Sequence, residues 1–68
     1  MTGFFYDILN ASDELVRWWP SPASGLDEAV AGLGGVALDA GERVRLFDNA
    51  SSAPLAVRSH DGLVEVLS

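Results

Sequence analysis

The alternation of hydrophobic and polar residues is clearest in the second half of the chain. Apolar side chains recur at every second position in three short runs, at residues 43–46, 55–58 and 64–67. A period of two is typical of strands that turn one face to a core and the other to solvent. Asp61-Gly62 lies between the last two runs, and this dipeptide favours a type I′ hairpin turn. The pattern therefore predicts an antiparallel meander.

The turns set the predicted strand pairing. The two-residue turn pairs Arg58 with Glu65. In the preceding hairpin a loop of residues 49–52 keeps apolar residues together, which decides the pairing because a slip of one residue turns every side chain to the other face. A turn at residues 39–41, with Gly in the left-handed region, adds a strand at Val36–Leu38. The predicted inner face comprises Val36, Leu38, Val44, Leu46, Leu55, Val57, Val64 and Val66.

The same pairing gathers arginines on the outer face of the predicted sheet. Arg43, Arg58 and Glu65 form one row across three strands, with Arg45 nearby. Two arginines directly opposite each other repel unless an anion lies between them. Arg43, Arg45 and Arg58 are therefore a candidate patch for a carboxylate or phosphate of a partner. The alternative is a solvated face in which Glu65 satisfies one arginine.

The first third of the chain predicts a helix. Between residues 3 and 19 the apolar residues recur at spacings of three and four, which is typical of an amphipathic helix. Pro20 ends the pattern. In a second interpretation residues 3–9 form a strand, because they are rich in aromatic residues, and Ser12 caps a shorter helix over residues 13–18.

A second, short helix is predicted for residues 26–33. Ser24 is placed to cap its start with Asp27 in the capping-box position, and Gly34-Gly35 ends it. The expected fold class is α+β, with two N-terminal helices packed on one face of a small antiparallel β-meander of three to four strands. Residues 1–68 are expected to form a single small domain, since this length is near the lower limit for a stable core.

Composition excludes several classes of function. Acidic residues outnumber basic ones ten to four, and the formal net charge is −6. Direct binding to nucleic acid is not expected, because affinity for phosphates rests on clustered Lys and Arg. The chain has no Cys and one His, so no metal site, disulfide or cofactor is expected. Ser59, His60 and Asp61 are sequence neighbours that strand alternation separates, so we expect no enzyme.

Targeting signals are not evident. The N-terminal residues lack a charged region followed by an apolar core. No apolar run approaches the ~20 residues that a membrane-spanning helix needs. The expected location is the cytoplasm.

Trp18 and the acidic residues are the candidate partner-binding groups. Neighbours on a helix point about 100° apart, so Trp19 would enter the core and Trp18 would lie at its flank, where an exposed Trp can anchor an interface. Carboxylates around it would steer a basic partner. The alternative is that the large side chains fill a small core and the acids complement helix dipoles. The acidic candidates are Asp7, Asp13, Glu14, Asp27 and Glu28.

A small, acidic, cysteine-free chain without catalytic residues resembles in type the accessory proteins of phages and mobile elements, among them anti-CRISPR and anti-restriction inhibitors. The resemblance covers size and charge. It implies a non-enzymatic inhibitor or adaptor that occludes a basic surface of a larger protein, such as one that binds nucleic acid. The alternative is a structural or assembly accessory subunit, such as a small virion component, that docks through a sheet edge or forms homo-oligomers.

Overall fold

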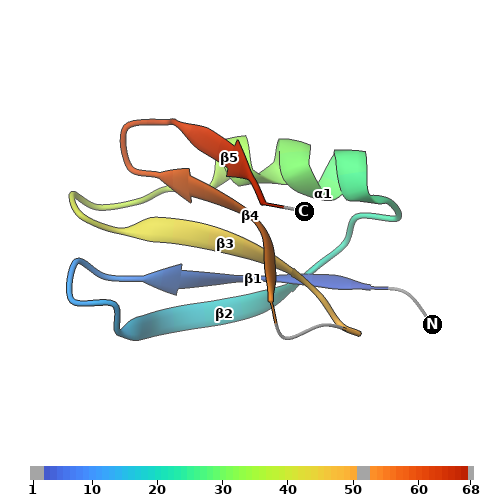
Figure 1. The fold of residues 1–68 in the computed structure, drawn as a ribbon, viewed down its shortest axis with the longest axis horizontal. Helices are drawn as coiled ribbons and strands as arrows, with labels where there is room; N and C mark the ends of the chain where they lie inside the picture. The colour runs from blue at the N-terminus through green and yellow to red at the C-terminus, as the bar shows by residue number, and fades with distance from the viewer. Residues whose placement is uncertain (1–2, 51–52, 68) are drawn as a thin grey trace.

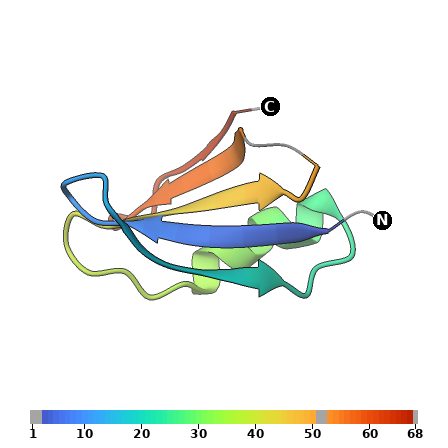
Figure 2. The ribbon, with the colours of Figure 1, turned by 90° about the horizontal axis from the view of Figure 1, so that it is seen from below.

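A five-stranded antiparallel sheet forms most of the structure (Figure 1). The computed structural model describes residues 3–50 and 53–67. The strands lie in the order β2-β1-β3-β4-β5, and a short helix that continues into a turn of 3-10 helix covers one face (Figure 2). In chain order the elements are β1 (Phe4–Leu9), β2 (Leu15–Ser21), α1 (Leu26–Gly32), η1 (Leu33–Gly35), β3 (Arg43–Asp48), β4 (Pro54–Ser59) and β5 (Val64–Val66).

The predicted α+β fold, with two N-terminal helices on a meander of three to four strands, is therefore wrong. The described residues form five strands and one short helical segment, α1 with η1, which we call the helix layer. β1 lies between β2 and β3 and is antiparallel to both, so β2 and β3 run parallel and α1 carries the chain across β1. Both halves of the chain contribute to the sheet.

Residues 3–19 form strands where the first interpretation predicts a helix. Their apolar residues fit helical spacings, but the aromatic and β-branched residues among them favour strands. The strand over residues 3–9 in the second interpretation is confirmed by β1. Its helix over residues 13–18 is wrong, because β2 begins at Leu15.

The turn between β1 and β2 explains why no helix forms there. The side-chain oxygen of Asn10 accepts hydrogen bonds from the backbone N–H groups of Ser12 (2.9 Å) and Glu14 (3.0 Å). Asp13 has a φ of +63°, which a right-handed helix excludes. Asn side chains that bond the backbone in this way compete with helix formation, so Asn10 reverses the chain.

The predicted helix over residues 26–33 is confirmed by α1 and η1, with a different cap. Gly25 is the N-cap and makes no side-chain hydrogen bond. The carboxylate that caps the first turn of the helix comes from Glu28 and not from Asp27. The Glu28 carboxylate accepts hydrogen bonds from the backbone N–H and the hydroxyl of Ser24, both at 3.1 Å.

The hairpin between β4 and β5 turns where the sequence predicts, but its loop is one residue longer. Gly62 has a φ of +94°, and its N–H donates to the carbonyl of Ser59 at 3.0 Å. These features define a three-residue loop that ends in a left-handed Gly. Arg58 therefore pairs with Val64 and not with Glu65.

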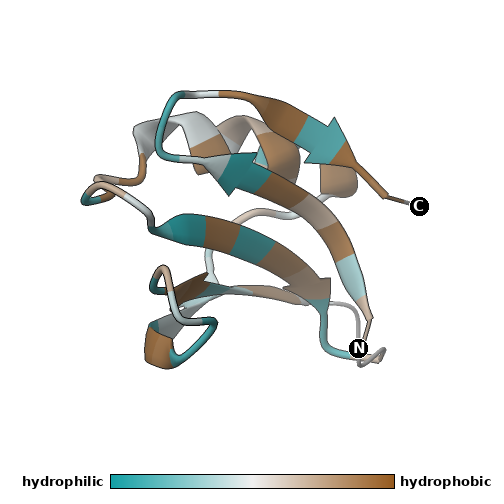
Figure 3. Cartoon of the chain, turned by 60° about the vertical axis from the view of Figure 1, so that its left-hand side comes forward, coloured by the Kyte–Doolittle hydropathy of each residue, from teal (hydrophilic) through white to brown (hydrophobic). Residues whose placement is uncertain are grey.

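The pairing of β3 with β4 also differs from the prediction. Val44 lies opposite Arg58, and Leu46 lies opposite Ala56, because a bulge at the start of β4 shifts the register. β3 still alternates between hydrophobic and hydrophilic residues (Figure 3). Val57 turns away from the helix layer, Ala56 enters the core in its place, and Arg58 moves to the helix side.

The segment Val36–Leu38, predicted as a strand, connects η1 to β3 without strand pairing. Val36 and Leu38 still pack against the core. The predicted turn that follows is confirmed, because Gly41 has a φ of +85° and the N–H of Glu42 donates to the carbonyl of Asp39 at 3.0 Å.

The core lies between the helix layer and the centre of the sheet. Val64 and Val66, predicted for the inner face, stay exposed because α1 does not reach over β5 (Figure 2). The Tyr6 hydroxyl donates to the carbonyl of Ala29 at 2.6 Å, and a Cβ at Gly32 would lie 2.4 Å from that hydroxyl. The buried cluster comprises Tyr6, Ile8, Ala29, Leu33, Val44, Leu46 and Ala56.

The close contact between Tyr6 and Gly32 predicts a non-additive pair of substitutions. Tyr6→Phe should lower the free energy of unfolding by about 1–2 kcal/mol, because it leaves the buried carbonyl of Ala29 without its donor. Gly32→Ala should destabilise the wild type through the clash, although its φ of −64° suits Ala. In the Tyr6→Phe background the same change should be neutral or stabilising by up to about 1 kcal/mol. Urea unfolding of the four proteins measures the cycle, and additive effects would contradict the contact.

Candidate functional site

The face of the sheet opposite the helix layer, which we call the open face, carries the most distinctive side chains. Alternation along paired strands decides its membership, since residues paired across strands share a face. Neither α1 nor η1 covers it (Figure 2). Its members include Phe5, Asp7 and Leu9 of β1, Leu15, Trp18 and Pro20 of β2, Arg43, Arg45 and Phe47 of β3, Val57 and Ser59 of β4 and Glu65 of β5.

Three aromatic rings form one end of the open face. Phe5 and Phe47 stack with ring centroids 4.9 Å apart and an interplanar angle of 6°, and Trp18 meets Phe5 edge-on at 6.2 Å. Trp18 is 63% exposed. A shallow depression of about 460 Å³ beside it is lined by Phe5, Asp7, Leu15, Trp18 and Asn49. The rings therefore hold an exposed indole on a rigid aromatic base.

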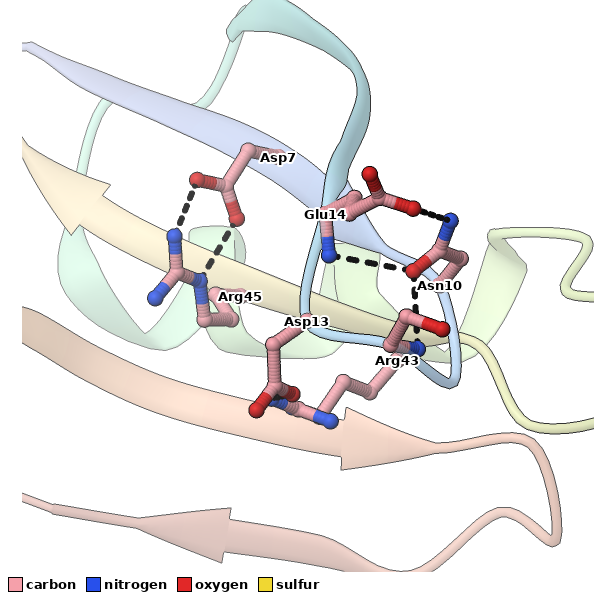
Figure 4. A network of polar contacts seen from close by, with 7 residues as sticks. Asp7, Asn10, Asp13, Glu14, Arg43 and Arg45 are labelled. Atoms are coloured by element: carbon pink, nitrogen blue, oxygen red, sulfur yellow. Dashed lines mark hydrogen bonds and ion pairs between the residues drawn. The ribbon is translucent and has the colours of Figure 1, made fainter.

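Asp7 and Arg45 form a two-pronged ion pair at the centre of the open face (Figure 4). The guanidinium donates to both carboxylate oxygens, at 2.8 and 2.7 Å, and also lies over the Phe47 ring at 4.9 Å. The hydrogen bond to Asp7 raises the pKa of Arg45. Asp7 is only 6% exposed, so the structure places this candidate inside an ion pair rather than at the surface.

A second ion pair joins the turn between β1 and β2 to the sheet. Arg43 on β3 pairs with Asp13 of the turn (Figure 4). Glu14 of the same turn is exposed, and its side chain accepts a hydrogen bond from Asn10 at 3.3 Å. Leu15, which follows Glu14, lines the depression beside Trp18. The structure thus brings two of the acidic candidates to the side of the open face where Trp18 lies.

The predicted row of Arg43, Arg58 and Glu65 does not exist. Arg58 lies on the helix side, where its guanidinium donates to the carbonyls of Leu33 (3.0 Å) and Val36 (2.7 Å). There it adds a second donor to the carbonyl of Leu33, which also accepts from the N–H of Val36 at 3.3 Å, and so it caps the end of η1. The one-residue change in pairing accounts for the error, because it exchanges the faces of neighbouring side chains. Arg43, Arg45 and Arg58 each have partners within the chain.

The remaining candidates lie on the other side of the molecule. Asp27 and Glu28 stand in the first turn of α1, with Glu28 bonded to Ser24. Trp19 turns toward the helix layer, where it packs against Tyr6 with ring centroids 5.5 Å apart. A second depression of about 470 Å³, which Trp19 and Glu28 help to line, separates β2 from α1.

The sequence places Phe47 on the outer face of the predicted sheet but does not predict its partners Phe5 and Leu15. The first interpretation puts both on a helix, and the second puts Phe5 in a strand without pairing that strand to the meander. The run of aromatic residues at 4–6, which favours a strand, was the signal that could have placed Phe5 in the sheet.

Neither similarity to known proteins nor a metal site assigns a function to this chain. No protein-family model, curated protein or solved structure matches this chain. In residues 3–50 and 53–67, no group of three or more His, Asp or Glu side chains is placed to hold a metal ion. Across the same described residues, no helix has the length and apolar character needed to cross a membrane. The case for function rests on the geometry of the open face.

The buried ion pair predicts unequal effects for two matched substitutions. Asp7→Asn should lower the free energy of unfolding by about 2–3 kcal/mol, because it breaks a largely buried pair and leaves Arg45 without its counterion. Asp13→Asn removes an equal charge from the exposed pair with Arg43 and keeps a residue that tolerates positive φ, so it should cost less than about 1 kcal/mol. Chemical denaturation measures both. Equal losses would contradict the structural role of Asp7.

Proposed function

We propose that this chain is a non-enzymatic protein-binding module that docks its open face on a basic surface of a larger, cytoplasmic protein and acts as an inhibitor or adaptor. One observation carries this function above all, namely the 63% exposed indole of Trp18 held against the Phe5–Phe47 stack. Exposed aromatic side chains on rigid supports are typical anchors of protein interfaces, since little conformational entropy is lost when they bind.

The distribution of charge supports a basic partner. All four arginines have partners inside the chain: Arg43 and Arg45 pair with carboxylates, Arg58 bonds carbonyls, and Arg17 lies over the Trp19 ring. The charged groups that a partner meets on this surface are therefore mainly carboxylates, in keeping with the net charge of −6. Such a surface attracts clustered Lys and Arg and repels phosphate groups. A protein that exposes a basic nucleic-acid-binding surface would be occluded by it.

Glu14 is positioned to add local steering. It is exposed and directly precedes Leu15, which lines the depression beside Trp18. Asp7 and Asp13 contribute less, because each has an arginine partner. Asp27 and Glu28 lie on the helix layer, so they act on the partner only through the overall field of the molecule.

Site-specific photocrosslinking tests the docking face. A benzophenone amino acid placed at Leu15, an exposed residue that lines the depression beside Trp18, should crosslink a protein in lysate of the native host, whereas the same group at Leu26, an exposed apolar residue on α1, should not. With the captured partner purified, Trp18→Ala should weaken binding by about 2 kcal/mol, roughly 30-fold, mainly through faster dissociation. Leu26→Ala should bind as the wild type does. Equal crosslinking from both positions, or full affinity of Trp18→Ala, would rule out the open face.

Salt dependence provides the charge control for the same complex. The association rate should fall steeply with ionic strength. Glu14→Gln should slow association more than Asp27→Asn, although both variants lose one negative charge. An association rate that does not change with ionic strength would argue against a basic partner, but it would not contradict the role of Trp18 as the anchor.

A further inference from the structure

β5 (Val64–Val66) is an edge strand that exposes apolar side chains on both of its faces. Leu63 and Val66 are 69% and 56% exposed, and Val64 and Leu67 are also exposed. The helix layer does not extend beneath this edge (Figure 2), and the strand is hydrophobic apart from one hydrophilic band (Figure 3). Exposed edges of this kind are templates for pairing with a further strand.

The hydrogen bonds to β4 show which backbone groups of β5 point outward. The N–H of Ser59 donates to the carbonyl of Leu63 (3.0 Å), and the N–H of Leu67 donates to the carbonyl of Leu55 (2.8 Å). Backbone groups alternate in direction along a strand. Odd-numbered residues of this segment therefore point toward β4, and the N–H and carbonyl groups of Val64 and Val66 point to the free edge, which no strand of the described residues occupies.

These directions make the edge complementary to itself in one antiparallel register. When β5 of a second copy pairs about a two-fold axis at Glu65, Val64 bonds Val66 of the second copy, and Leu63 faces Leu67 of the second copy. Every apolar residue then meets an apolar residue. A shift by two residues in either direction would place Glu65 opposite an apolar residue, Leu63 or Leu67 of the second copy, and a shift toward the turn would also place Val66 opposite Gly62 and lose hydrogen bonds.

Glu65 is the one residue of β5 that opposes this pairing, because it would meet a like charge. It would face Glu65 of the second copy in a non-hydrogen-bonded pair, where side chains approach most closely. Within the chain Glu65 lies opposite Val57 on the open face, and Arg58 points to the other face. Charged residues on edge strands commonly prevent unwanted pairing.

We infer that β5 is a homotypic pairing surface on which a second copy of this chain adds antiparallel about Glu65, and that the charge of this residue pair controls the association. The partner is fixed as a second copy by the match of apolar residues and free backbone groups in a single register. The inference does not depend on the docking function of the open face.

Mixing variants of opposite charge tests the register. Wild type and Glu65→Lys should each be mainly monomeric at low salt, and their equimolar mixture should form a mixed dimer that native mass spectrometry detects, because Glu65 then faces a Lys. Asp27→Lys, which changes the net charge equally but lies on α1, should form no such dimer with wild type. Absence of the mixed dimer, or an equal yield with Asp27→Lys, would overturn the inference.

Neutralising the charge gives an independent readout. Glu65→Gln should dimerise on the order of tenfold more tightly than wild type in sedimentation equilibrium, since the repulsion between two close charges is gone. Adding Val66→Pro should abolish this dimer without unfolding the protein, because the N–H of Val66 points to the free edge and has no role in pairing with β4. A Glu65→Gln variant that stays monomeric, or a dimer that persists with Val66→Pro, would also overturn it.

Discussion

The register of β3, β4 and β5 is the constraint on which the rest of the structure depends. Side chains alternate between the two faces of a strand, so one residue of shift exchanges the faces of a whole strand. The three-residue loop that ends at Gly62 and the bulge at the start of β4 together set this register. They place Ala56 in the core and Arg58 against the helix layer, and they leave Val57 on the open face.

The electrostatic character of the molecule follows from that register. With Arg58 turned to the helix side, it bonds the carbonyls of Leu33 and Val36, and Arg43 and Arg45 remain on the open face with carboxylate partners. An acidic chain whose arginines have internal partners presents little positive charge to a ligand. The open face is left with an aromatic anchor, Trp18, beside an acidic turn, and this combination suits a protein partner better than an anionic ligand.

The parts of the fold that local signals determine could be predicted from the sequence. The turns at Gly41 and Gly62, the helix that starts after Gly25 and the three C-terminal strands all have short-range signals. The N-terminal half could not be resolved in the same way. The apolar residues of Phe4–Leu9 fit both periods, and the hydrogen bonds of the Asn10 side chain decide in favour of a hairpin.

The candidate site was predictable only in part, because most of its contacts join residues that are far apart in the sequence. Trp18 is exposed as expected, but because it lies on the open face of an edge strand and not at the flank of a helix. The pairing of Asp7 with Arg45 joins residues 38 positions apart, which no local pattern specifies. The arginine row failed because it depended on a loop length that Asp61-Gly62 alone does not fix, since this dipeptide fits loops of two or three residues.

Cross-strand nuclear Overhauser effects between Hα protons test the register most directly. Hα protons approach closely only in non-hydrogen-bonded antiparallel pairs. The account predicts strong Hα–Hα effects between Arg58 and Val64 and between Ala56 and Val66. Strong effects between Ser59 and Val64 and between Val57 and Val66 would instead show the two-residue turn, because these are the non-hydrogen-bonded pairs of that register. That result would return Arg58 to the face of Glu65 and would contradict both the open face and the β5 edge described above.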